Sequence, residues 1–139
     1  MAGTVVESIV KYGVEHGVAE KVLAKFTCVG DADDGTIPDT AFSATLMSLI
    51  RGMFLYLMVT VPGDTAPTAS YDITVVNADA LDILGGAGAD RSASAAEQVM
   101  PIISSTAQKR LVTDDLTLKI ANQAVHSADI VVQLLFTRN

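Results

Sequence analysis

The chain has 139 residues and a mass of 14.5 kDa, a size that is typical of a single domain. Half of its residues are hydrophobic and 18% are charged, so it can bury a core and is not intrinsically disordered. Its formal net charge of -7 argues against nonspecific nucleic-acid binding, and the single Cys28 excludes an intrachain disulfide framework and a cysteine-based zinc cluster.

The N-terminal segment Thr4–Tyr12 is rich in β-branched residues, which favours a strand, with a short helix as the alternative. An N-terminal arm over residues 1–12 is a further interpretation, because the segment lacks a clear core pattern. The next segment alternates between apolar and polar side chains and is predicted to be a strand whose apolar face carries Val22, Ala24, Phe26 and Cys28.

The most apolar stretch, Ala41–Val61, is long enough to cross a bilayer, but Arg51 and Gly52 lie at its centre. We therefore expect no membrane span, and we predict that Met53–Val61 is a strand covered on both faces. Simple alternation leaves several apolar residues of this strand and of later strands pointing outward: Phe54, Tyr56, Met58, Val76, Val131 and Leu135.

Three later segments, Tyr71–Val75, Leu116–Ile120 and Ile130–Phe136, alternate in the same way and are predicted to be strands. Leu81–Leu84 is predicted to be a short strand, and Ala87–Gln98 a long loop or a weak helix. Short strands separated by turn residues indicate an all-β fold. We predict one β-sandwich domain over residues 1–139, jelly-roll or immunoglobulin-like, with room for a short helix in its loops.

Two loops and two histidines are the candidates for chemistry. The acidic loop Asp31–Gly35 lacks the spacing of an EF-hand, whose twelfth position here is Phe42, so a solvated turn is favoured over a calcium site. The glycine-rich loop Gly85–Arg91 lacks the Gly-Lys-Ser/Thr ending of a phosphate-binding loop. It also lacks the third glycine of a dinucleotide-binding motif, whose position is Arg91 here. His16 and His126 lie in turn-like contexts with no nucleophile motif nearby, and Cys28 reads as a small buried hydrophobe. We predict no enzyme activity, no cofactor and no metal.

The chain has more apolar material than the interior of a small sandwich needs, with a mean hydropathy of +0.40. Because monomers rarely expose large apolar patches, we expect a second subunit to cover part of this surface. A larger interior is the competing explanation.

Several segments together resemble small structural proteins from the head gene clusters of tailed bacteriophages: Pro62–Thr74, Asp79–Gly86, Ala89–Ser92, Glu97–Val99, Leu116–Ile120 and Ile130–Arg138. Within that group, an acidic β protein of this size is similar to capsid cement or decoration proteins. The resemblance implies a dimer or trimer that binds the major capsid protein on the outside of the shell and clamps neighbouring capsomers. It also implies synthesis in the cytoplasm of the bacterial host, and no nucleic-acid or membrane partner.

Under this resemblance the contacts with the capsid or another partner would come from segments that lack a core pattern. The candidate contact residues are Val5, Val6, Ile9, Tyr12, Asp31, Asp33, Asp34, Arg91, Lys109 and Arg110, with the Gly85–Gln98 loop as a further element. Two alternatives stay open: a neck or tail subunit of the same kind of virion, and a small calcium- or ligand-binding β module.

Overall fold

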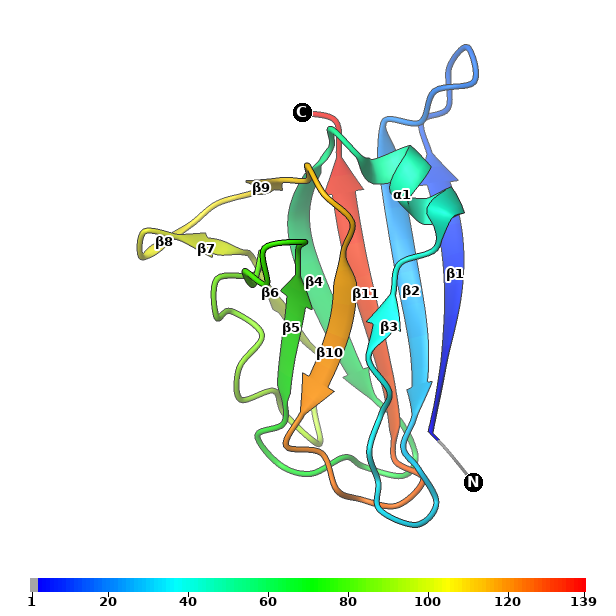
Figure 1. Cartoon of the computed structure of the whole chain (residues 1–139), viewed down its shortest axis with the longest axis vertical. Helices are drawn as coiled ribbons and strands as arrows, with labels where there is room; N and C mark the ends of the chain where they lie inside the picture. The colour runs from blue at the N-terminus through cyan, green and yellow to red at the C-terminus, as the bar shows by residue number, and fades with distance from the viewer. Residues whose placement is uncertain (1–2) are drawn as a thin grey trace.

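The computed structural model describes residues 3–139, and it consists mainly of antiparallel strands in two facing sheets (Figure 1). The elements in chain order are β1 (Thr4–Tyr12), β2 (Lys21–Val29), β3 (Thr40–Ala41), α1 (Ala44–Ile50), β4 (Phe54–Pro62), β5 (Asp72–Val76), β6 (Glu97–Val99), β7 (Ile102–Ile103), β8 (Thr106–Ala107), β9 (Arg110–Leu111), β10 (Thr117–Ala121) and β11 (Asp129–Thr137). The predicted all-β, sandwich-like class is confirmed.

The larger, six-stranded sheet has the order β1-β2-β11-β4-β6, and β9 also pairs with β4. The smaller sheet, β3-β10-β5, lies across one face of the larger sheet, and α1 lies on the same side (Figure 1). The β7–β8 hairpin projects away from the two sheets beside β4 (Figure 1). We call the opposite side of the six-stranded sheet, turned away from the smaller sheet, the outer face.

The core lies between the two sheets and follows the predicted alternation. In the larger sheet it is formed by fully buried side chains of β2 and β11: Val22, Ala24, Phe26, Cys28, Ile130, Val132, Leu134 and Phe136. The smaller sheet contributes Ile73, Val75, Leu118 and Ile120. The rings of Phe26 on β2 and Phe42 after β3 join the layers, with centroids 5.0 Å apart. Burial of these large side chains supplies most of the driving force for folding.

The N-terminal segment is a strand, not a helix or a free arm, within the described residues. β1 pairs with β2 at all nine positions, from Thr4 opposite Val29 to Tyr12 opposite Lys21. Residues 1–2 of the predicted arm lie outside the described residues. The other edge of β1 has no partner strand among residues 3–139, so β1 forms one edge of the large sheet.

In the stretch Ala41–Val61 the first half contains α1, and the second half is the strand β4, within one residue of the predicted Met53–Val61. The faces of β4 differ from the prediction. Met58, predicted to point outward, is fully buried, because the pairing of β4 with β11 shifts at a bulge between Leu135 and Phe136. A bulge moves every later side chain to the opposite face. The outward side of β4 stays partly exposed, so the strand is not covered on both faces.

The segments that follow β5 are mostly turns. Leu81–Leu84 is not a strand, because only the single bridge between Val76 and Asp82 connects it to a sheet. Ala87–Gln98 is a loop as far as the start of β6. No helix in residues 3–139 is long and apolar enough to cross a membrane.

Candidate functional site

The outer face carries an apolar row that crosses four adjacent strands. Val10 of β1 lies opposite Leu23 of β2, Leu23 opposite Leu135 of β11, and Leu135 opposite Leu57 of β4. Directly paired residues share a face, so these side chains form one continuous row, which we call the apolar rung. Val10 is 44% exposed, and the three leucines are partly exposed. The surplus of apolar residues predicted from composition therefore lies partly on this face, although Leu23 and Leu57 were not singled out from the sequence.

The edge strand β1 continues the apolar rung to the border of the sheet. Val6, Val10 and Tyr12 project from its outer side and are 62%, 44% and 47% exposed. Val5 and Ile9 point the other way and pack partly buried against the core. Of the four contact residues predicted in this segment, Val6 and Tyr12 are therefore at the surface, whereas Val5 and Ile9 mainly hold β1 onto the sandwich.

The loops at one end of the molecule are acidic. Segments 30–39, 63–71 and 122–128 contain Asp31, Asp33, Asp34, Asp39 and Asp64 but no lysine or arginine. Figure 1 places these three loops together at the end where β2 and β4 finish and β11 begins. We call this region the acidic end. It joins three of the predicted contact residues, Asp31, Asp33 and Asp34, into one surface.

The side chain of Gln123 holds the acidic end together. Its amide nitrogen donates to the carbonyl of Gly35 at 2.6 Å and to that of Val125 at 2.9 Å. Its oxygen accepts from the backbone N–H of Thr68 at 2.9 Å and from that of Val125 at 3.1 Å. Gln123 is only 6% exposed, and its bonds reach all three loops. Gln123 is not among the residues predicted from the sequence, since an isolated glutamine in a loop carries no motif.

The carboxylates of the acidic loop cap its own turns. Asp31 Oδ1 accepts from the N–H of Asp33 at 2.6 Å, and Asp34 Oδ1 accepts from the N–H and hydroxyl of Thr36 at 3.0 and 2.8 Å. The bonds from Thr36 lower the pKa of Asp34. Among residues 3–139 no group of three or more His, Cys, Asp or Glu side chains is placed to hold a metal ion. The acidic loop therefore presents a negatively charged surface whose turns are held by bonds to its own carboxylates.

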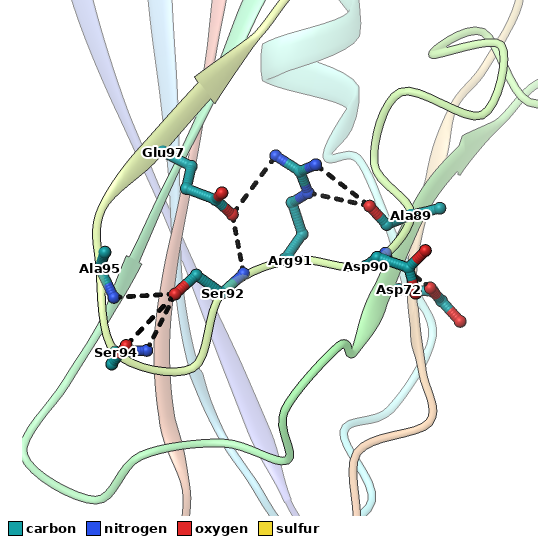
Figure 2. Close-up of polar contacts among 8 residues, drawn as sticks. All are labelled: Asp72, Ala89, Asp90, Arg91, Ser92, Ser94, Ala95 and Glu97. Carbon is teal, nitrogen blue, oxygen red and sulfur yellow. Dashed lines mark hydrogen bonds and ion pairs between the residues drawn. The ribbon is translucent and has the colours of Figure 1, made fainter.

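Local side-chain bonds also shape the glycine-rich loop (Figure 2). Arg91 donates from Nε and Nη2 to the carbonyl of Ala89, at 3.2 and 3.1 Å, and its Nη1 lies 3.5 Å from Glu97 Oε1. Glu97 in turn accepts from the N–H of Ser92 at 2.7 Å. The side chain of the predicted contact residue Arg91 is only 13% exposed, and its contact with Glu97 connects the loop to β6. Beside this loop, the carboxylate of Asp82 accepts from the N–H groups of Val75, Leu84 and Gly86.

The two remaining predicted contact residues lie at the start of β9, beside the edge of β4: Lys109 precedes the strand and Arg110 is its first residue. Arg110 lies opposite Leu55 in the pairing of β9 with β4. Lys109 is exposed, and its Nζ lies 4.7 Å from the centroid of the Phe54 ring. The ring face attracts the ammonium group and so orients it. These cations lie at the end of the sheet opposite the acidic end, so the structure does not gather the ten predicted residues into one site.

Two buried groups carry perturbed pKa values. Burial raises the pKa of the Cys28 thiol to about 12, and the side chain is fully enclosed. Burial also raises the pKa of Tyr71, opposed in part by the neighbouring Thr60 hydroxyl. Neither the Tyr71 nor the Thr60 hydroxyl completes a hydrogen bond within the described residues. His16 and His126 are both exposed in turns.

Comparisons of the chain with protein-family models, with curated proteins and with solved structures find no match.

Proposed function

We propose that this protein is a non-enzymatic structural subunit of a tailed-bacteriophage virion, a cement or decoration protein on the outside of the capsid shell. The observation that carries the proposal is the apolar rung, which runs across four strands and ends at the unpartnered edge of β1. A contiguous apolar surface of this kind is typical of proteins that work in contact with other subunits. That the assembly is a phage head is inferred from the resemblance of the loop and strand segments to phage head proteins.

The edge of β1 suits pairing with a second copy of the chain. Its nine residues pair with β2 without a bulge, and the segment Thr4–Val10 contains no proline or lysine, the usual devices that block edge pairing. The one acidic side chain in that segment, Glu7, is bonded to Ser43. Antiparallel pairing centred on Ser8 would place Val6 opposite Val10 of the second copy. Apolar cross-strand pairs of this type each contribute about 0.2–1 kcal/mol.

In such a dimer the two large sheets would form one sheet, and the outer faces of both copies would be continuous. The major capsid protein is the proposed partner for this enlarged face, with the acidic end, including Asp31, Asp33 and Asp34, as a second contact. Specific interfaces of standard size bury about 1,200–2,000 Å² in total. Repetition over a capsid lattice lets contacts of moderate affinity act together. The proposed location is the virion, after synthesis in the bacterial cytoplasm.

Co-sedimentation with empty shells assembled from the major capsid protein of the source virion tests the proposal. We expect saturable binding with a fixed number of copies per capsomer, lost in the variant Leu23→Asp/Leu135→Asp. The matched variant Thr45→Asp/Ser48→Asp, on exposed positions of α1, should bind as the wild type does. Absence of saturable binding to intact shells would contradict the cement assignment.

One observation favours the neck or tail alternative. The acidic end lies a full nine-residue strand, about 30 Å, from the end of the sheet that carries Lys21, Lys109 and Arg138. Opposite charge at opposite ends favours head-to-tail contacts, which build rings or fibres. Electron microscopy of the purified chain at low salt separates the alternatives, because a neck or tail subunit should form rings or stacks without shells.

A further inference from the structure

A groove of about 610 Å³ lies where the start of β2, the end of β11 and the β7–β8 hairpin meet. Its walls include Lys21, Tyr56, Met100, Gln108, Lys109 and Arg138. The volume is within the range of protein binding sites. We call this feature the basic groove. Its lining contains residues of β2, β4 and β11 but none of β1.

The basic groove concentrates positive charge in an acidic protein. Three of the nine Lys and Arg residues line it, against Glu20 as the acidic side chain in its wall. Lys21 and Lys109 form no ion pair with any residue from 3 to 139, and the described bond of the Arg138 guanidinium is from Nε to the carbonyl of Ala19 at 2.9 Å. These cations are therefore free to bind carboxylates, and an arginine fork does so with good geometry.

The groove continues into a second hollow. A second depression of about 290 Å³ is lined by Leu57, Gln98 and Val99 and shares Tyr56 and Met100 with the basic groove. Along this side of β4, β9 pairs with Phe54 and Leu55, and β6 pairs with Met58–Thr60. Tyr56 and Leu57 lie in the gap between these two ladders. An extended chain entering here would meet cations at one end and apolar side chains at the other.

We propose that the basic groove and the adjoining hollow bind an extended peptide segment of a partner protein that has acidic residues next to apolar residues. The acidic residues would contact Lys21, Lys109 and Arg138, and the apolar residues would lie against Leu57, Val99 and Met100. A nucleic acid fits less well, because the net charge of the protein is -7 and Tyr56 is the one aromatic side chain in the two linings. This inference goes beyond the proposed function and does not depend on which assembly the protein joins.

Fluorescence anisotropy with the full chain tests the inference. The probes are the fluorescein-labelled peptide Glu-Asp-Glu-Gly-Leu-Val and its reverse sequence. We expect at least one probe to bind saturably below about 1 mM and to weaken with added salt. Lys21→Glu and Arg138→Glu should each weaken binding about tenfold or more, because each turns an attractive contact into a repulsive one.

Lys119→Glu is the matched control, because it makes the same charge change on β10 in the other sheet and should leave binding unchanged. A peptide with Ser-Ser in place of Leu-Val should bind more weakly, as should a peptide with lysines in place of its acidic residues. No saturable binding by either probe would overturn the inference, as would equal effects of Lys21→Glu and Lys119→Glu. Salt-sensitive self-association abolished by Lys21→Glu would instead make the acidic end of a second copy the occupant, and would overturn the assignment to a partner protein.

Discussion

Glu7 of the edge strand β1 accepts two hydrogen bonds from Ser43, the residue that caps the N-terminus of α1. The donors are the backbone N–H of Ser43 at 3.0 Å and its hydroxyl at 2.5 Å, and the same hydroxyl oxygen accepts from the N–H of Leu46 at 3.1 Å. Two segments 36 residues apart in sequence are thereby joined. The contact holds β1 against the sandwich and turns its acidic side chain away from the free edge.

The first prediction concerns this contact. Ser43→Ala should lower the free energy of unfolding by about 1–2 kcal/mol, because it removes the helix cap. Glu7→Gln should lower it by about 1 kcal/mol, because the bonds that the carboxylate accepts are charge-assisted. Urea unfolding of the single and double variants measures the coupling. Fully additive losses would show that the two side chains do not act together.

A second prediction concerns Gln123. Gln123→Ala should lower the free energy of unfolding by about 2–3 kcal/mol, since it leaves buried backbone groups of three loops without partners. Gln123→Glu should also be destabilising at pH 7, because a carboxylate cannot donate to the carbonyls of Gly35 and Val125. Gln98→Ala, at an exposed position on β6, is the control and should change stability by less than about 0.5 kcal/mol. A Gln123→Ala variant as stable as this control would contradict the role given to Gln123.

The buried hydroxyls of Tyr71 and Thr60 lead to a prediction of the opposite sign. Because neither hydroxyl completes a hydrogen bond in the described structure, Tyr71→Phe/Thr60→Val should leave stability unchanged or raise it by up to about 1 kcal/mol. Thermal unfolding of the double variant measures this. A clear loss of stability would show that these hydroxyls make bonds in solution.

The thiol of Cys28 should be inert in the folded protein. Its pKa of about 12 leaves almost no thiolate at pH 8, and the side chain is fully buried. We expect no reaction with a chromogenic disulfide reagent at pH 8 until the chain is unfolded in guanidinium, when one thiol per chain should react. Rapid labelling of the native protein would contradict the observed burial.

The fold was predictable where one strand face is buried and the other is not. In β2 and β11 every second residue is apolar and fully enclosed, so the period of two in the sequence locates both the strand and its inward face. The same alternation predicts the wrong face for Met58 in β4, because the bulge opposite Leu135 and Phe136 shifts the alternation by one residue. No residue type in Phe54–Pro62 marks the position of this bulge.

Other features depend on contacts between distant segments. The helix α1 has a local signal, since Ser43 is a good cap and Leu46, Met47 and Ile50 recur on one face, but the apolar run around it conceals that pattern. The short strands β6 to β9 have two or three residues each and exist because they meet β4 or each other. Of the cations in the basic groove, only Lys109 was among the predicted contact residues. Lys21 and Arg138 are brought to the groove by the pairing of β2 with β11, which the sequence does not reveal.

Light scattering coupled to gel filtration, at several protein concentrations, tests self-association through β1 most directly. We expect a species of twice the 14.5 kDa chain mass for the wild type, and a monomer for Val6→Lys. Val18→Lys, the same change at a valine of similar exposure in the β1–β2 hairpin, should remain a dimer. A wild-type chain that is monomeric at every concentration, or a Val6→Lys variant that still dimerises, would contradict self-association through the edge of β1.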